Sequence, residues 1–587
     1  MRTAMELRRW GGDLRGVIVL ASMLLLASCG GDAEPGGGSN FEAYTPINIG
    51  GSGEGFFERW RLYDVDINMD EADLQTLKGE GRSLASAARD CIPEYEYTRF
   101  SSTVTISARN LDGEEVAEPV TMDKVNIRKK GFIGSLSITR PSVILYFDDL
   151  VPGRTYKQRD RMTLNNNRQD ASKARTCMSF WLFEKAGLPT PQCNFARVTI
   201  NGEDMGIFSH VEPMRMPFLQ SAFGPGEGNL YESQTADFGT YLSPRFEKKN
   251  FRRQGRSDLE AIDAVIELED DQAMLDILSQ QVDIEQFIEF WAMEVLLGLW
   301  DGATGNANNF SIYAPPSDGR FRFLPWGPDT GFSPNHQLSP GTGVIYRNFS
   351  LANRFYEIPE LRAQFESTLE DYLDNVWDED ELLDQLANIR QLTGVDIDAQ
   401  SHVLDFIDVQ RDRIEDELEL ATASGSVSLL NNVPPNCGPP VKTTVIGELS
   451  TGPEGESGTV EFVRDGNEIA AQLQGGIFGG TVSGFDGEMS EPRVEALTLL
   501  FSGDDGSFYG LQFFIEAPQF TDGSFGLMGF SNNVILIEIN PATFNFSLLA
   551  LGDTGTITLS GVDDYLADSG NLAVDLDLVL EYGQGVQ

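Results

Sequence analysis

The segment at residues 425–443, which contains the letters NNVPPNCGPP, separates two stretches of chain with different hydrophobic patterns. Before it, strand-like alternation and helix-like spacing are mixed. After it, short alternating runs such as TVEFVRD, GLQFFIEAP and LAVDLDLVLEY are separated by turn residues, which is typical of antiparallel all-β folds. Clustered proline and glycine mark a linker. We therefore predict an α+β domain at residues 58–424 and a separate β-sandwich or barrel at residues 444–587.

The N-terminus has the pattern of an export signal. Arginines precede the apolar run VIVLASMLLLA, which ends at Cys29 and is short for a membrane span. The LASC tetrapeptide resembles a bacterial lipobox, which implies a signal peptide at residues 1–29, cleavage before Cys29 and acylation of its thiol; an ordinary signal peptide stays open. Gly30 favours the outer membrane or cell surface of a bacterium. Residues 30–57 have the Gly- and Ser-rich composition of a flexible tether.

The charge balance limits the possible partners. The chain has 43 basic and 90 acidic residues, a formal net charge of -47. Such a chain repels nucleic-acid backbones and anionic lipid head groups, so we expect no nucleic-acid partner and a membrane contact only through the lipid anchor. Divalent cations suit this acidity better. With only three histidines, His-based triads and His-rich metal sites are poor interpretations.

Four cysteines follow Cys29 in the chain. An even number in an exported chain favours disulfides, and four cysteines allow three pairings. Cys177 and Cys193 are close enough in sequence to join a helix to the following strand, which would leave Cys91 with Cys437. No CxxC or Cys/His spacing indicates zinc.

Several local signals predict individual elements of the α+β domain. Asp70 has the position of a helix cap, and SKARTCMSFWLFEKAGLPTP has helical spacing that ends at Gly187. Asn201-Gly202 predicts the turn of a β-hairpin. Residues 257–300 have helical spacing in two parts.

The stretch WDGATGNANNFSIY at residues 300–313 carries the residue types that phosphoryl transfer needs. Asp301 follows an apolar helix pattern, Asn306 comes five residues later, and Asp329 lies in the turn FLPWGPDTGF. One carboxylate would accept the hydroxyl proton, while an Asn oxygen and a second carboxylate would hold magnesium against phosphates. Asn/Gly clusters also form ordinary turns, so a structural loop stays open at this point.

Seven motifs occur in an order that resembles the CotH kinase family, the spore-coat protein H-like atypical kinases. They are VNIRKKG, RPSVILYF, RMTLNNNRQDAS, GLPTPQCNFARVTINGEDMGIFSHVE, GNLYE, WDGATGNANNFSIY and FLPWGPDTGF. The similarity covers roughly residues 60–420. It implies an atypical protein-kinase-like fold, with a mixed or antiparallel sheet and helices, that transfers phosphate from ATP with Mg²⁺ or Mn²⁺ to Ser/Thr hydroxyls of proteins.

The resemblance also implies a nucleotide-binding set. Lys130 in R-K-K-G would contact ATP phosphates, with help from Arg128, because a lysine places a compact charge there. Glu212 in SHVE would orient that lysine or reach the metal through water. Without the family, Lys129 and Lys130 would be read as a solvated strand edge and Glu212 as a surface residue.

The catalytic and metal roles carry over by the same matching. Asp301 would be the catalytic-loop acid, and Asp329 the principal metal-binding carboxylate. Either Asn306 or Asn309 would be a metal ligand: Asn309 fits the family's N-N-[FY] register, and Asn306 has the kinase spacing from Asp301.

Two positions depart from the family pattern. Gly327 stands where many members have a second aspartate, which leaves Asp329 alone to hold metal charge at that turn. Arg140 stands where the family often has lysine, which keeps the charge but changes reach and geometry.

Two other functions stay open. Extracytoplasmic compartments hold little ATP, so the fold would also suit a cell-surface adhesin or binding protein, or a nucleotide-binding pseudokinase scaffold. The sequence does not name the protein phosphoacceptor.

Overall fold

The computed structural model describes residues 47–87, 95–233, 235–239, 243–250, 255–334, 343–420, 441–464, 467–483, 489–528, 532–540, 546–567 and 569–582. The predicted signal peptide, the lipidation site Cys29, residues 30–46 of the tether and nearly all of the linker lie outside these ranges. Cys91 and Cys437 also lie outside them, so their pairing stays a prediction.

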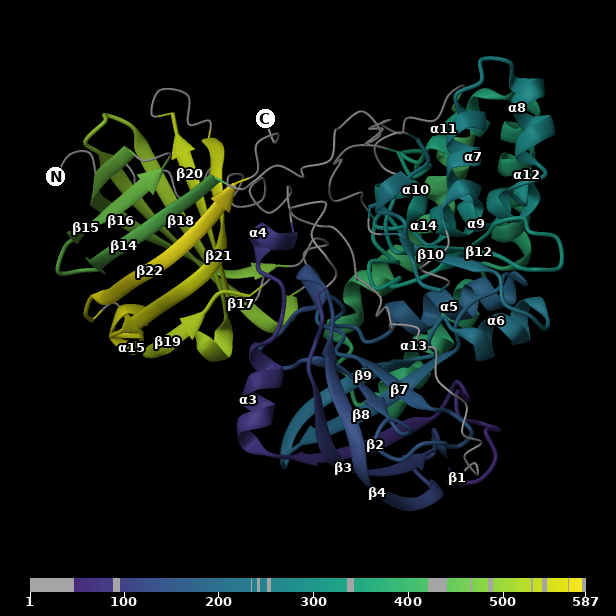
Figure 1. Cartoon of the computed structure of the whole chain (residues 1–587), viewed down its shortest axis with the longest axis horizontal. Helices are drawn as coiled ribbons and strands as arrows, with labels where there is room; N and C mark the ends of the chain where they lie inside the picture. Colours follow the sequence, from purple (N-terminus) through teal and green to yellow (C-terminus); the bar gives the residue numbers. More distant parts are fainter. Residues whose placement is uncertain are drawn as a thin grey trace.

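The first part of the chain forms a closed seven-stranded barrel (purple and blue in Figure 1). Its strands, in spatial order, are β2 (Leu62–Met69), β3 (Arg99–Arg109), β4 (Glu115–Lys130), β5 (Ser142–Tyr146), β7 (Arg161–Asn165), β9 (Glu203–Val211) and β8 (Cys193–Ile200). Neighbours are antiparallel except β2 and β8, whose parallel pairing closes the barrel. Alternate residues of β2 and β3 are buried, as the period of two in a strand requires. Apolar side chains therefore fill the barrel interior.

Two local predictions for this part of the chain are confirmed, the helix cap at Asp70 and the hairpin turn at Asn201-Gly202. Helix α3 (Glu71–Gly79) begins at Asp70, whose carboxylate accepts the backbone N–H of Ala72 and of Asp73. Strands β8 and β9 meet at Asn201-Gly202, both with positive φ, as a tight hairpin turn requires. Helix α4 (Leu84–Ala87) follows α3.

The segment predicted as the end of a tether, residues 47–57, differs from that expectation. Strand β1 (Ile47–Ile49) pairs in parallel with β6 (Arg154–Tyr156). Phe56 is 1% exposed and Phe57 8% exposed, and the two rings pack against His210 at 4.8 and 4.6 Å between centroids. These two aromatic side chains hold the segment on the barrel because their burial removes large apolar surface from water.

The second part of this domain is helical (mostly teal and green in Figure 1). Its first helix lies between β7 and β8 in the chain, and the other helices come after β9. Its helices are α5 (Arg175–Lys185), α6 (Met216–Phe223), α7 (Ser257–Ile266), α8 (Asp271–Leu278), α9 (Ile284–Leu296), α10 (Ala303–Asn306), α11 (Ser350–Glu357), α12 (Pro359–Asn375), α13 (Glu379–Thr393) and α14 (Ser401–Leu418). A four-stranded antiparallel sheet accompanies them, in the order β11 (Glu247–Lys248), β10 (Asn229–Glu232), β12 (Phe310–Ala314) and β13 (Arg322–Pro325).

The centre of the helical part is α9, whose side chains are buried almost throughout. Trp291 of α9 stacks on Phe365 of α12 with ring centroids 3.8 Å apart. Within the described ranges, none of the helices has the length and apolar character needed to cross a membrane.

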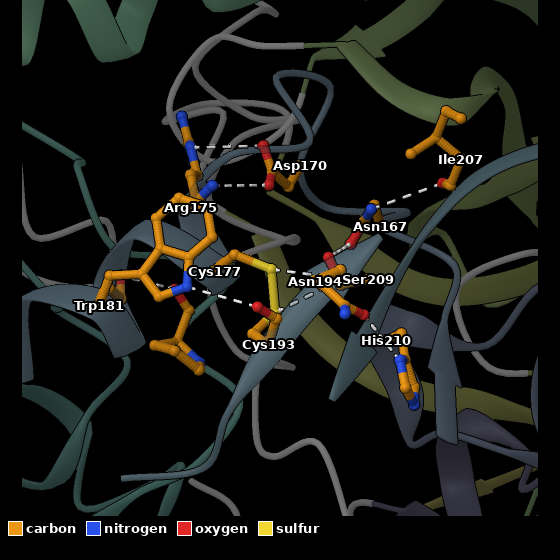
Figure 2. The surroundings of a disulfide bond; sticks show 12 residues. Asn167, Asp170, Arg175, Cys177, Trp181, Cys193, Asn194, Ile207, Ser209 and His210 are labelled. Atoms are coloured by element: carbon orange, nitrogen blue, oxygen red, sulfur yellow. Dashed lines mark hydrogen bonds and ion pairs between the residues drawn. A yellow bond between two sulfur atoms is a disulfide. The ribbon is translucent and has the colours of Figure 1, made fainter. Parts of the chain in front are cut away.

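A disulfide joins the helical part to the barrel. Figure 2 shows the bond between Cys177 of α5 and Cys193 of β8, which confirms the predicted pairing. The indole Nε1 of Trp181 donates to the Cys193 carbonyl at 3.4 Å. Helix α5 is thus fixed against the strand that follows it.

The C-terminal barrel (green and yellow in Figure 1) is built from β14 (Val441–Thr451), β15 (Ser457–Arg464), β16 (Asn467–Ser483), β17 (Met489–Gly503), β18 (Phe508–Glu516), β20 (Asn532–Ile539), β21 (Phe546–Ser560) and β22 (Leu572–Tyr582). Pairing of β21 with β22 closes this ring, and β19 (Gly523–Gly526) pairs with the outer part of β21. The helix α15 (Val562–Leu566) follows β21.

This barrel has an apolar core of its own. The predicted fold class, an α+β domain followed by a separate all-β domain, is therefore confirmed, and of the two predicted forms the all-β domain is the barrel.

Candidate functional site

A pocket opens where the seven-stranded barrel meets the helical part. It has about 550 Å³ of empty space, and this figure includes space open to solvent. Its walls are formed by Lys130, Gly131, Ser135, Ser142, Asn165, Asn166, Asn167, Thr176, Phe180, Val211, Trp326, Gly327 and Asp329. The structure thus brings two of the predicted residues, Lys130 and Asp329, to the lining of one pocket.

Lys130 is the last residue of β4 and is 7% exposed. Its Nζ donates to Asn165 Oδ1 at 2.6 Å and lies 5.7 Å from the centroid of the Trp326 ring. Strand alternation directs Lys129 to the opposite side. The ammonium group is therefore held at the pocket wall, not at a solvated strand edge.

Arg128 does not reach the pocket wall. Its guanidinium lies 5.8 Å from the centroid of the Tyr146 ring, on the neighbouring strand β5. Arg140, on the loop after β4, donates to the Ile207 carbonyl and lies 5.2 Å from the Phe208 ring. Both arginines thus contact the strands of the barrel.

Asp301 follows α9 and accepts three side-chain amides. The Nδ2 atoms of Asn306, Asn308 and Asn309 lie 2.7, 3.3 and 2.9 Å from its carboxylate oxygens. Ala307 and Asn309 have φ of 53° and 50°, a conformation that side-chain-bearing residues rarely adopt and that is concentrated at functional sites. The Asn cluster therefore wraps around the carboxylate of Asp301.

A buried glutamate, Glu294 of α9, supports this loop. One of its oxygens accepts the Ala303 N–H at 2.8 Å, and the other accepts the Thr304 N–H at 2.8 Å and its hydroxyl at 2.7 Å. These N–H groups belong to the first turn of α10 and have no partner within their own helix. The sequence reading missed Glu294, although an acid within the apolar run FWAMEVLLGLW is a signal of a buried polar role.

Asp329 lies in the turn after β13 and faces the pocket. Its pKa is raised to about 7, chiefly by burial and then by the nearby Asp301 and Asp170 carboxylates, while Arg175 opposes the shift. Asp301 and Asp329 are therefore electrostatic neighbours. Gly327, two residues earlier, has φ of 52°, so the residue that replaces the family's aspartate occupies a left-handed position that favours glycine.

Asp170 and Arg175 are two buried charged residues that act electrostatically on Asp329. Figure 2 shows the Arg175 guanidinium facing the Asp170 carboxylate, with Nε 3.9 Å from Oδ1. The Arg175 backbone N–H also donates to Asp170 Oδ2 at 3.0 Å. Burial raises the pKa of Asp170, although Arg175 opposes this. The sequence assigned no role to either residue, although Asp170 lies in the motif RMTLNNNRQDAS and Arg175 in the predicted helix SKARTCMSFWLFEKAGLPTP.

The donor chemistry of this region fits a magnesium or manganese ion. The carboxylate of Asp329 and the amide oxygen of Asn306 or Asn309 are hard ligands of the kind that these ions prefer. The described residues contain no group of three His, Cys, Asp or Glu side chains arranged to hold a metal.

Glu212 is not brought to Lys130. Its carboxylate lies 3.5 Å from the guanidinium of Arg159, and its backbone N–H donates to the Gln192 carbonyl at 2.8 Å. Burial raises its pKa, while Arg159 lowers it. The polar partner of Lys130 is Asn165, from the Asn165–Asn167 run, which the sequence reading did not single out.

Comparison with curated proteins finds two relatives in the fungus Rhizopus delemar. The chain is 24% identical over 242 residues to Spore coat protein homolog 1, covering 38% of this chain and 39% of the relative. It is 25% identical over 244 residues to Invasin CotH7, covering 38% and 40%. The chain thus spans about two fifths of the length of these relatives.

Comparison with solved structures finds two bacterial proteins. One is the Helicobacter pylori proinflammatory kinase CtkA, with TM-score 0.28 and 10% identity, covering 47% of this chain and 92% of that one. The other is the HipA, HipB and operator DNA complex of Shewanella oneidensis MR-1, with TM-score 0.23 and 14% identity, covering 52% and 61%.

A family model confirms the resemblance that the seven motifs carry. The model described as CotH kinase protein matches residues 127–421, which is half of the chain and contains Lys130, Asp301 and Asp329. The C-terminal barrel lies outside this match. The chain therefore belongs to the CotH kinase family.

Proposed function

We propose that this chain is an exported CotH-like protein kinase that transfers phosphate from ATP to Ser/Thr hydroxyls of a protein. One observation carries the proposal: Lys130 and Asp329 line the same pocket, and Asp301 is the electrostatic neighbour of Asp329. A lysine and an aspartate in the same pocket, with a second aspartate close to the first, suit ATP phosphates bridged to a divalent metal.

The residues would divide the work as follows. Lys130 contacts the ATP phosphates, and Asp329 with Asn309 or Asn306 holds Mg²⁺ or Mn²⁺. The bound ion would neutralise charge that develops on the phosphates. Asp301, held by three amides, would accept the proton of the attacking hydroxyl.

The test is phosphate transfer by the purified chain without residues 1–29, given labelled ATP and Mg²⁺ or Mn²⁺ with a generic basic protein. The variants Asp301→Ala and Asp329→Ala are compared with Asp384→Ala, an exposed acid of α13. We expect label with wild type and Asp384→Ala, and at least about a hundredfold loss in the other two variants. Equal label in all four proteins, or none in any, would count against the kinase.

A second candidate is a surface binding protein that uses the same fold without turnover. The relative named Invasin CotH7 favours it. Binding to host cells or glycans that survives both Asp301→Ala and Asp329→Ala would support this candidate. A nucleotide-dependent thermal shift without any label would instead indicate a pseudokinase scaffold.

We also propose that a lipid on Cys29 holds the protein at the outer membrane or cell surface. The support is the LASC tetrapeptide after the apolar run. Expression of the full chain in a bacterium with labelled palmitate should label wild type but not Cys29→Ser. Equal labelling of the two chains would contradict the anchor.

A further inference from the structure

We infer that Glu516, the last residue of β18 in the C-terminal barrel, is a positioning residue for the ATP pocket and acts through Thr139 and Arg168. The inference rests on the proposed function. It gives the C-terminal barrel a part in the kinase site, although the barrel lies outside the family match.

Glu516 inserts a carboxylate into the first domain. The side chain is fully buried. Its Oε2 accepts the Thr139 backbone N–H at 3.2 Å and the Thr139 hydroxyl at 2.6 Å, and its Oε1 lies 3.7 Å from Arg168 Nε. A buried carboxylate is stable only when hydrogen-bond donors and opposite charges surround it. Thr139 and Arg168 therefore hold Glu516 in position, and Glu516 in turn holds these two residues.

The contacts continue from Arg168 to the pocket wall. Arg168 donates through Nη1 to the Gly134 carbonyl at 2.6 Å and through its backbone N–H to Asn166 Oδ1 at 3.1 Å. Asn166 Nδ2 in turn donates to the Ser135 carbonyl at 3.1 Å. Ser135 and Asn166 both line the pocket, so one hydrogen bond joins Arg168 to the pocket wall at Asn166, and a second continues from Asn166 to Ser135.

The loop that this network holds, residues 131–141, has little regular structure of its own. It contains one short 3₁₀ turn at Ile133–Ser135. The ring of Phe132 belongs to an apolar cluster shared with the C-terminal barrel, whose members are Leu84, Ala85, Phe132, Val494, Ala496, Phe514, Ile535, Ile537 and Leu551. Figure 1 shows α4, which carries Leu84 and Ala85, beside that barrel. The loop is therefore held mainly by contacts to other elements.

The end of β4 places one lysine at the pocket and the neighbouring lysine against the C-terminal barrel. Lys130 faces the pocket. Lys129 is fully buried on the other side, where its Nζ donates to the Lys78 carbonyl at 2.6 Å and lies 3.2 Å from Met528 Sδ of the C-terminal barrel. The end of β4 that presents Lys130 to the pocket thus rests on that barrel.

The experiment compares wild type with Glu516→Gln, Thr139→Val and the matched control Glu461→Gln, an exposed acid of β15. Glutamine keeps an acceptor for Thr139 but removes the charge opposite Arg168. We expect Glu516→Gln to raise the KM for ATP about tenfold, with kcat within about threefold, because the pocket wall is misplaced while Asp301 is not. Thr139→Val should raise KM in the same direction, and Glu461→Gln should leave it unchanged.

The second readout is deuterium uptake of the loop at residues 131–141, which needs no catalytic activity. Glu516→Gln should increase uptake there relative to Glu461→Gln. An active wild type with unchanged KM in Glu516→Gln, even with a lower thermal midpoint, would overturn the positioning role and leave the kinase intact. A wild type that neither binds ATP nor transfers phosphate would overturn the kinase, and unchanged uptake would then also remove the role of Glu516 in holding the loop.

Discussion

At the carboxyl group of Asp301, burial and hydrogen bonding act in opposite directions. Burial raises its pKa to about 7, because desolvation disfavours the charged form, while the amides of Asn306, Asn308 and Asn309 lower it. A pKa near the working pH suits a group that accepts a proton during reaction.

Removing one of these donors should move the pH dependence of the kinase. Asn308→Ala deletes the Nδ2 donor 3.3 Å from Asp301 without touching either proposed metal ligand. Because the charged form loses support, the pKa of Asp301 rises and the acid limb of the rate profile moves to higher pH. The measurement is kcat/KM for ATP between pH 5 and 9. An acid limb at the wild-type position, in a variant with normal thermal stability, would contradict Asp301 as the proton acceptor.

Among the elements, α9 and α10 depend on each other through Glu294. Its carboxylate serves as the cap of α10, which the intervening residues do not provide. Gly302 and Gly305 allow this close packing, since a Cβ at Gly302 would overlap the Glu294 carboxylate and one at Gly305 the Trp300 carbonyl. The loop that carries Asp301 is therefore shaped by packing against α9.

Replacing this cap should cost stability and activity together. Glu294→Gln puts an amide N–H₂ against donors that now face a carboxylate oxygen, so we expect a loss of about 1–3 kcal/mol in the free energy of unfolding. Urea unfolding measures this loss. The control Glu285→Gln, an exposed acid of the same helix, should change it by less than about 0.5 kcal/mol. Equal effects of the two substitutions would contradict the capping role.

The disulfide between α5 and β8 should contribute through the unfolded state. It closes a loop with a sequence separation of 16, for which chain-entropy arguments give about 3 kcal/mol. The double variant Cys177→Ala/Cys193→Ala should therefore unfold at lower urea, with a loss of about 2–4 kcal/mol. Wild type refolded in reductant should show a similar loss. An unchanged midpoint in both would show that α5 is held by packing alone.

At the scale of the whole molecule, two barrels with separate cores share a buried contact. Lys129 lies in this contact, with Glu516 and Glu80 as the charged groups that face it. Burial lowers the pKa of Lys129 to about 7, and these two carboxylates oppose the shift only in part. The interface therefore holds an amine that is half neutral near pH 7.

The lowered pKa of Lys129 should make the free energy of unfolding increase with pH. An unfolded chain binds the Lys129 proton up to about pH 10.4, and the folded chain releases it near pH 7, so the free energy of unfolding rises with pH between these values. The slope from this group is at most about 1.4 kcal/mol per pH unit. Lys129→Met should remove it, which unfolding at pH 7 and pH 9 measures. A difference between wild type and Lys129→Met that is the same at both values would contradict the shifted pKa.

The sequence predicted those parts of the structure that depend on nearby residues. The cap at Asp70, the turn at Asn201-Gly202 and the helix after Arg175 follow from local backbone preferences. Residues 257–300 form three helices where two were expected, because Asp270 caps a separate helix α8. In a chain with 90 acidic residues, an acidic helix cap cannot be told from a surface acid. The sequence therefore did not predict the start of α8 at Asp270.

By itself the sequence determined the family, the α+β and all-β parts, the Cys177–Cys193 pair and the motifs that carry Lys130, Asp301 and Asp329. Only the tertiary structure decided which residues meet. Asn165 and not Glu212 contacts Lys130. Glu294 and Glu516 each hold a loop to which no pattern in the sequence links them. The physical reason is range: caps, turns and periodicity act over a few residues, whereas the Thr139–Glu516 contact joins positions 377 residues apart and exists only when both barrels are closed and packed.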